Sequence, residues 1–155
     1  MSESVYLTAE GAEELRQELE TLTTVRRPEL ARKLREAVED GDLKENANYH
    51  DTREQQALVE GRIQYLENIL RSAQIISKDG NTDIVQLGSE VTIREEGSDE
   101  DETYIIVGAA EANPREGRIS HQSPIGSVLL GRRKGDTVRA ATPAGEMVFK
   151  IRHVK

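Results

Sequence analysis

The stretch that decides the fold is Gly41-Asp42-Leu43-Lys44-Glu45-Asn46-Ala47-Asn48-Tyr49-His50, which interrupts two long helical patterns. Gly41 is typical of the residue that follows a helix C-terminus. Two carboxylates, those of Asp42 and Glu45, follow it directly. Because two helices of similar length joined by a very short turn must be antiparallel neighbours, we expect a helical hairpin with its tip near residues 40–46.

The segment before the tip predicts one helix from Thr8 to Asp40, with Thr8 as its N-cap. An expected apolar seam follows heptad spacing along it: Ala12, Leu15, Leu19, Leu22, Leu30, Leu34 and Ala37. The step of eight between Leu22 and Leu30 is an insertion-like slip beside Pro28, which lacks a backbone donor and should bend the helix locally. At 1.5 Å per residue this arm is about 50 Å long.

The second arm is predicted to run from near Asp42 to about Ala73, with Asp42 as N-cap and Glu45 in a capping box. Its seam is expected at Leu58, Arg62, Tyr65, Ile69, Ser72 and Ile76, with Leu66 and Ala73 widening the apolar stripe. Toward the tip the apolar residues of both arms thin to alanines. This pattern indicates a slender end, suited to entering a narrow space.

After the turn-rich residues 77–82 the period changes from helix to strand. We expect strands over 83–87, 90–94, 103–107, 118–121, 137–141 and 147–154, and a short helix over 123–130. The fold class is therefore α+β. A long antiparallel coiled-coil hairpin at 1–76 is followed by a linker at 77–82 and a small antiparallel sheet domain with one short helix at 83–155.

Composition narrows the classes of partner. The 155 residues contain 21 Lys and Arg against 29 Asp and Glu, a net charge of −8, so free non-specific DNA binding is disfavoured and a protein partner is expected. There is no cysteine, which excludes disulfides and cysteine zinc sites. No stretch approaches the ~20 apolar residues that span a bilayer, and we expect a soluble cytoplasmic protein without a membrane partner.

Asp42 and Glu45 admit two compatible interpretations. They can cap the second helix, and their free oxygens can also serve as metal ligands at the apex of the hairpin. Exposed carboxylates without a third ligand hold Mg²⁺ weakly, so the tip is at most half a metal site that a partner must complete. No phosphate-binding glycine loop or hydrolase motif accompanies them.

Basic residues lie along the first arm and near the tip: Arg26, Arg27, Arg32, Lys33, Arg35, Lys44 and Arg53. They fit a solvated coiled-coil face with ion pairs. They also fit a basic stripe that steers a phosphate backbone toward the tip. The sequence leaves both alternatives open.

Several motifs together resemble the bacterial Gre transcript-cleavage factors over essentially the whole chain. They are Val25-Arg26-Arg27-Pro28-Glu29, residues 41–56, Glu60-Gly61-Arg62-Ile63, residues 104–108, Ser123-Pro124-Ile125 and residues 142–146. The resemblance implies a coiled coil followed by an FKBP-like domain. It also implies that this second domain docks at the rim of the secondary channel of RNA polymerase while the coiled coil enters the channel.

The implied activity is stimulated cleavage of the nascent RNA 3′ end in backtracked complexes. Asp42 and Glu45 would help to hold a second Mg²⁺, shared with the polymerase, and to orient a water. The protein would then be an accessory factor rather than an enzyme, and no small-molecule substrate is expected. Arg53 matches the basic patch of the family, which contacts the extruded RNA, and Lys44 is assigned with it.

The same resemblance implies roles for four further residues. Ser123, Pro124 and Ile125 match the polymerase-docking region. Asn48 stands where family members often have Glu, which should leave the core pair working and alter the charge of the tip.

Three rival functions remain. Some Gre-like relatives occupy the channel and inhibit polymerase, but their tips differ, and the Asp42/Glu45 motif favours cleavage. A prolyl isomerase needs an aromatic-lined pocket, and the chain has no Trp and one Phe. A coiled-coil scaffold would use the tip carboxylates only for capping.

Overall fold

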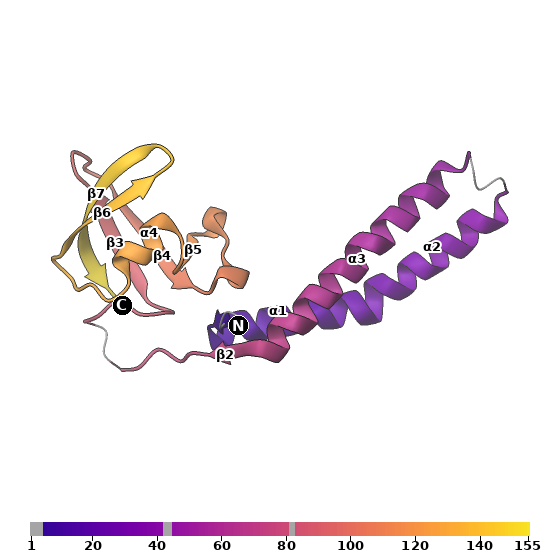
Figure 1. Ribbon diagram of the computed structural model, residues 1–155, viewed down its shortest axis with the longest axis horizontal. Helices are drawn as coiled ribbons and strands as arrows, with labels where there is room; N and C mark the ends of the chain where they lie inside the picture. Colours follow the sequence, from indigo (N-terminus) through magenta and orange to yellow (C-terminus); the bar gives the residue numbers. More distant parts are fainter. Residues whose placement is uncertain (1–4, 42–44, 81–82) are drawn as a thin grey trace. The chain divides into compact units, whose positions relative to one another are not determined.

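The computed structural model describes residues 5–41, 45–80 and 83–155 (Figure 1). Contacts divide the chain into two compact units, one formed by Met1–Ala12 with Ala73–Lys155 and the other by Glu13–Ser72. These contact units do not follow the expected limits of 1–76 and 83–155, because both ends of the helical segment form strands. β1 (Val5–Leu7) pairs in parallel with β2 (Ala73–Ile75).

The first arm of the hairpin is continuous from α1 (Ala9–Thr21) through η1 (Leu22–Arg26) to α2 (Arg27–Glu39). η1 is a π-helical turn, closed by a bond from the Arg27 backbone N–H to the carbonyl of Leu22. A π turn holds one residue more than an α turn, so it absorbs the step of eight in the heptad pattern. The expected slip beside Pro28 is therefore a local π turn inside a continuous helix.

Hydroxyl groups satisfy carbonyls that precede this turn. Thr23 Oγ1 donates to the Leu19 carbonyl at 2.9 Å, and Thr24 Oγ1 donates to the Glu20 carbonyl at 2.7 Å. Threonine hydroxyls that bond back to carbonyls one turn earlier are compatible with a helix and often accompany a local change in its course.

The second arm is α3 (Ala47–Ser72), antiparallel to the first arm. Its buried residues are Thr52, Ile63 and Leu66, which lie against a seam that includes the buried Leu30 and Ala37 of α2. The seam expected through Leu58 and Tyr65 is wrong, since both side chains are exposed, whereas Leu66, expected to widen that seam, is buried. The helical hairpin itself is confirmed.

The remaining strands form a five-stranded sheet with the order β5-β4-β3-β7-β6. They are β3 (Glu90–Glu95), β4 (Asp101–Val107), β5 (Arg118–Ser120), β6 (Thr137–Thr142) and β7 (Gly145–Val154). All neighbours are antiparallel except β4 and β5, which are parallel, so the sheet is mixed rather than antiparallel as expected. The chain reaches β5 by a crossover through the short helices η2 (Ala109–Glu111) and η3 (Pro114–Glu116).

Side chains that alternate along these strands build one apolar core, with α4 (Pro124–Leu129) packed over it. Phe149 and Ile151 of β7 meet Ile93 of β3, and all three are almost completely buried. The strand expected over 83–87 does not form. Ile84 makes a single bridge to Arg133, while Val85 still contributes to the core.

A buried carboxylate fixes the start of α1 to η2. Glu111 accepts hydrogen bonds from Thr8 N at 2.8 Å and from Thr8 Oγ1 at 2.5 Å. Thr8 Oγ1 in turn accepts from Gly11 N at 3.0 Å, which confirms Thr8 as the N-cap. A Cβ at Gly11 would lie 2.3 Å from the Glu111 carboxyl carbon, so this approach requires glycine.

Candidate functional site at the hairpin tip

The first arm ends as its sequence predicts. α2 ends at Glu39, and Asp40 is its C-cap. Gly41 follows with a φ of +120°, a conformation that side-chain-bearing residues rarely adopt. The predicted site residues Asp42 and Lys44 come next and lie outside the described residues.

Asn46 joins the two arms across the turn. Its side-chain amide donates from Nδ2 to the Ala37 carbonyl of α2 at 2.6 Å, and its Oδ1 accepts from Tyr49 N at 3.1 Å. One side chain thus satisfies a free carbonyl at the end of one helix and a free N–H at the start of the next.

Asn46 is therefore the N-cap of the second arm, which begins at Ala47. The expected capping box from Asp42 to Glu45 is wrong, because the helix begins five residues beyond Asp42. Sequence reasoning missed Asn46, although asparagine is among the preferred N-cap residues. With helix capping assigned to Asn46, Glu45 is released from that role.

Glu45 lies in the turn with its side chain exposed. Within the described part of the chain its carboxylate has no hydrogen-bond or ion-pair partner. Among residues 5–41, 45–80 and 83–155, no group of three His, Asp or Glu residues is arranged to hold a metal ion. The exposed carboxylate of Glu45 is an oxygen donor of the kind that Mg²⁺ prefers.

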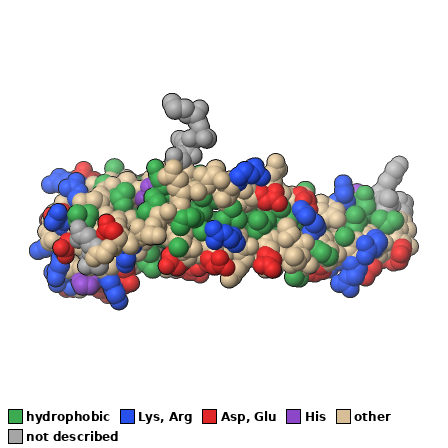
Figure 2. All heavy atoms as spheres, turned by 90° about the horizontal axis from the view of Figure 1, so that it is seen from below, with side chains coloured by type: hydrophobic (Ala, Val, Ile, Leu, Met, Phe, Trp, Pro, Cys, Tyr) green, Lys and Arg blue, Asp and Glu red, His purple; other side chains and the backbone are tan. Residues whose placement is uncertain are grey.

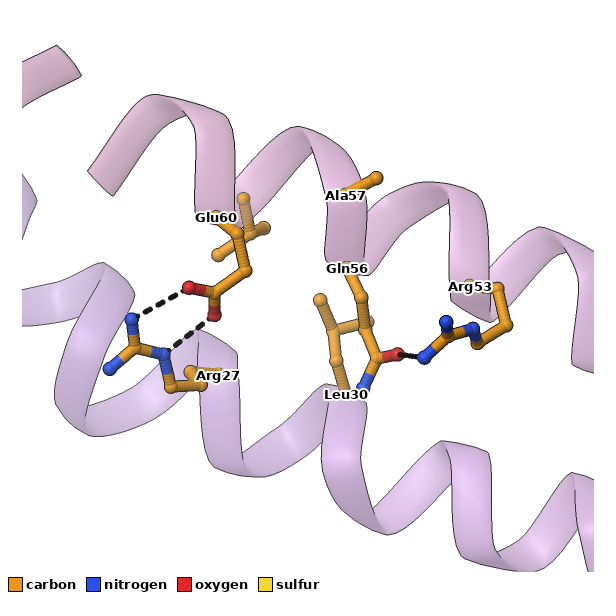
Figure 3. A pocket seen from close by; sticks show the side chains of 7 residues that line it. Arg27, Leu30, Arg53, Gln56, Ala57 and Glu60 are labelled. Carbon is orange, nitrogen blue, oxygen red and sulfur yellow. Dashed lines mark hydrogen bonds and ion pairs between the residues drawn. The ribbon is translucent and has the colours of Figure 1, made fainter. Parts of the chain in front are cut away.

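Arg53 lines a pocket of about 330 Å³ between α2 and α3 (Figure 3). The lining residues are Arg27, Leu30, Arg53, Gln56, Ala57, Val59 and Glu60. Across this pocket Arg27 binds Glu60 through two hydrogen bonds of 2.7 and 2.8 Å. The hydrogen bond raises the pKa of Arg27 and lowers that of Glu60. Arg53 makes a weak hydrogen bond to Gln56 Oε1 at 3.4 Å, and no ion pair of Arg53 with a described residue is found.

The basic residues of the first arm differ from Arg53 in their contacts. Arg26 and Lys33 both pair with Glu29, at 3.3 Å each. Arg26 also donates to Gln55 of the opposite arm at 2.7 Å. The contacts thus favour the ion-paired coiled-coil face for these residues. Arg53, in contrast, makes no ion pair with a described residue, so its charge is open to a partner.

The predicted docking residues lie at the start of α4, in the unit that contains the sheet. Ser123 is its N-cap and accepts from Gly126 N at 3.0 Å, as expected from the sequence. Pro124 is exposed, and Ile125 is partly buried against the core. Of the three residues, Pro124 therefore presents the freest surface.

Two family models together cover the chain. One describes the N-terminal part of a transcription elongation factor and matches residues 5–75, and the other describes the C-terminal part of GreA/GreB and matches residues 80–155. The chain belongs to the GreA/GreB family. The resemblance found in the sequence is thereby confirmed.

Individual GreA/GreB relatives agree. Transcription elongation factor GreA of Geobacillus kaustophilus is 53% identical over 150 residues, which is 96% of this chain and 95% of the relative. GreA of Bacillus subtilis is 48% identical over 145 residues, covering 94% and 92%. The solved structure of GreA factor homolog 1 of Thermus thermophilus is 34% identical, covers 99% of both chains and has a TM-score of 0.46. Among the described residues no helix is long and apolar enough to cross a membrane.

Proposed function

We propose that this GreA/GreB member binds RNA polymerase and stimulates cleavage of the 3′ end of backtracked RNA. The observation that carries the proposal is the exposed carboxylate of Glu45 at the turn of the hairpin, which makes no hydrogen bond or ion pair with a described residue. It belongs to a chain that matches an elongation-factor family along both of its parts. The protein acts as an accessory factor, because a tip carboxylate without further ligands holds Mg²⁺ only weakly.

The tip supplies acidic ligands to a site that the polymerase completes. Glu45 and Asp42 together would hold one Mg²⁺ jointly with carboxylates of the polymerase, as the hard oxygen donors of both residues allow. Such an ion, when bound, lowers the pKa of a water and stabilises the leaving oxygen of a phosphodiester. The residues of this chain contribute negative charge and orient the water.

The other candidate residues have supporting roles in this proposal. Arg53, which has no ion pair with a described residue, holds a phosphate of the extruded RNA, and Lys44 acts with it closer to the tip. Ser123, Pro124 and Ile125 form part of the surface that docks on the rim of the secondary channel. Ser123 does so through the structure of α4, since its hydroxyl already caps that helix.

The deciding experiment uses stalled, backtracked polymerase complexes with labelled RNA and Mg²⁺. We expect the wild type to shorten the transcript, and the Asp42→Ala/Glu45→Ala variant to bind polymerase without shortening it. A Glu39→Ala/Glu54→Ala variant removes the same charge from exposed positions of the hairpin and should stay active. Full activity of the tip variant would contradict the catalytic roles. A wild type that binds and never cleaves would favour a channel inhibitor.

A further inference from the structure

The face of the sheet that lies opposite its apolar core carries a group of basic side chains. Along β7 two core residues, Phe149 and Ile151, alternate with exposed ones. The exposed residues are Lys150 and Arg152, which therefore lie on the opposite face. In Figure 2 Lys and Arg side chains reach the surface of the unit that contains the sheet, interspersed with Asp and Glu. A pocket of about 480 Å³ opens between β3, β7 and β6, and four cations line it: Arg94, Arg139, Lys150 and Arg152.

Two of these cations stand directly opposite each other on neighbouring strands. Arg94 of β3 is the register partner of Lys150 of β7. Like charges directly opposite one another in a sheet are unfavourable. On its other side Lys150 faces Thr137 of β6, and no hydrogen bond or ion pair of Lys150 with a described residue is found. The repulsion is relieved when an anion binds between the two cations.

A β-bulge directs a third cation to the same pocket. Ile93 of β3 pairs with Ile151 of β7. The preceding residue, Thr92, pairs with His153, so Arg152 has no residue opposite it on β3. Bulges of this kind re-aim a side chain and are frequent next to functional sites.

One carboxylate serves both guanidinium groups that flank Lys150. Asp101 Oδ1 accepts a hydrogen bond from Arg94 Nε at 2.7 Å. The same oxygen lies 4.0 Å from Arg152 Nε. Three cations thus share one carboxylate, which leaves an excess of two positive charges on this face in a chain whose net charge is −8.

The other charged residues of the pocket do not cancel this excess completely. Arg139 is paired with Glu146 at 3.3 Å. Glu95 follows Arg94 in β3, and successive side chains of a strand point to opposite faces, so its carboxylate points away from that of the cations. Glu96, exposed just beyond the end of β3, is the one carboxylate among the described lining residues that opposes anion binding.

We propose that this face of the sheet binds a small molecule that carries a phosphate group. Two excess positive charges match a doubly charged phosphate, whose oxygens accept the forked hydrogen bonds of arginine. The hydroxyl of Thr137, opposite Lys150, is a further donor. The volume of the pocket lies in the range of small-molecule sites. A long nucleic acid is a poorer occupant, because the acidic chain disfavours a polyanion that needs many phosphate contacts. The site is independent of the hairpin tip and of the proposed function.

The test uses inorganic pyrophosphate as the probe, titrated into isotopically labelled full-length protein and followed by NMR of the backbone amides. We expect amides of β3, β6 and β7 around the pocket to shift. Lys150→Gln should raise the dissociation constant about ten-fold through loss of a charge-assisted contact. It should not lower the Tm, because it also removes the like charge opposite Arg94. Arg115→Gln removes the same charge from an exposed position on η3, outside the pocket, and should change the dissociation constant by less than about two-fold because of screening.

A substitution of opposite sign sharpens the test. Glu96→Gln removes the carboxylate that opposes the anion and should tighten the binding of pyrophosphate. Wild-type affinity in Lys150→Gln, or weaker binding in Glu96→Gln, would overturn the proposal. Equal shifts with sodium sulfate at the same ionic strength would reduce the site to general attraction of anions and overturn it as well. Displacement of pyrophosphate by a lower concentration of a single-stranded RNA oligonucleotide would assign the face to nucleic acid instead of a small ligand.

Discussion

The sheet and the helical hairpin are stabilised in different ways. The sheet closes over an apolar core in which Phe149, Ile93 and Ile106 are at most 1% exposed. In the hairpin the buried seam narrows from Ile63 and Leu66 to the small side chains of Ala37 and Thr52 near the tip. Since buried apolar area is the main source of stability, the sheet gains much more from each residue than the tip of the hairpin does.

Hydrogen bonds and ion pairs between the two arms stabilise the hairpin in addition to its apolar seam. Glu18 binds Arg62, Arg27 binds Glu60, and Asn46 binds the Ala37 carbonyl. Exposed ion pairs stabilise a fold only modestly. The comparison therefore teaches that the hairpin keeps much of its side-chain surface exposed at the expense of a core, whereas the sheet buries its side chains.

The largest effect is expected when one core side chain is removed from the sheet. Phe149→Ala should lower the free energy of unfolding by about 3–5 kcal/mol, because it leaves a cavity as well as losing buried area. Urea unfolding, combined with hydrogen exchange of peptides from β7, measures the effect. Leu58→Ala on the hairpin is the control, and we expect it to stay within about 0.5 kcal/mol of the wild type. Equal losses in the two variants would break the comparison.

Part of the fold could be predicted because the apolar spacing and the end of a single helix depend on residues that are close together in the sequence. The seam of the first arm, the slip beside Pro28 and the stop at Gly41 all follow from local spacing. The hydrogen-bond partner of Thr8 does not follow from local spacing. Its N-cap role is local, but Glu111 lies 103 residues away along the chain. The parallel β4–β5 pair likewise depends on a crossover that no local pattern specifies.

The seam of the second arm was wrong because two patterns with the same spacing run one residue apart. Leu58, Arg62, Tyr65 and Ile69 follow steps of four, three and four, and so do Val59, Ile63, Leu66 and Leu70. The second set is wholly aliphatic, and that was the signal for burial. Of the first set, Leu58, Arg62 and Tyr65 are exposed and Ile69 is partly buried.

At the tip, the turn after Gly41 could be predicted from the sequence, whereas the start of the second helix could not. Acidic residues beside Gly41 indicated a working tip, and Glu45 is exposed there. The helix start was misplaced because Asp42 and Asn46 are both favourable N-caps, and sequence alone does not rank them. The contact of Asn46 with Ala37 decides the choice, and that contact exists only once the two arms are side by side.

Substitutions of Asn46 should change stability by an intermediate amount. They can also separate its two roles, as N-cap of α3 and as donor to the Ala37 carbonyl. Asn46→Ala should destabilise the hairpin by about 1 kcal/mol through loss of the cap. Asn46→Asp keeps an acceptor for Tyr49 N but loses the donor to the Ala37 carbonyl, so it should cost less. Hydrogen exchange of amides in residues 47–52 measures the effect, and amides of β7 are the internal control. Equal exchange in all three proteins would show that the tie across the turn is unimportant.

The smallest expected effect concerns the exposed pair of Arg27 and Glu60. The hydrogen bond from Arg27 lowers the pKa of Glu60 below its ordinary value. A carboxyl whose pKa is lower in the folded state stabilises the fold above its unfolded pKa, and this stability is lost as the pH falls through the folded value. The Tm difference between wild type and Glu60→Gln should therefore be largest at neutral pH and should disappear in acid below the lowered pKa.

Salt gives an independent check on this pair. Both side chains are about half exposed, so 1 M salt should screen most of their attraction and reduce the difference in Tm at neutral pH. Glu54→Gln changes the same charge at an exposed position without an ion pair to any described residue, and it should show neither dependence. A difference that grows on acidification, or that persists unchanged in salt, would mean that Glu60 acts through packing. The hairpin would then resemble the sheet more closely than its polar ties suggest.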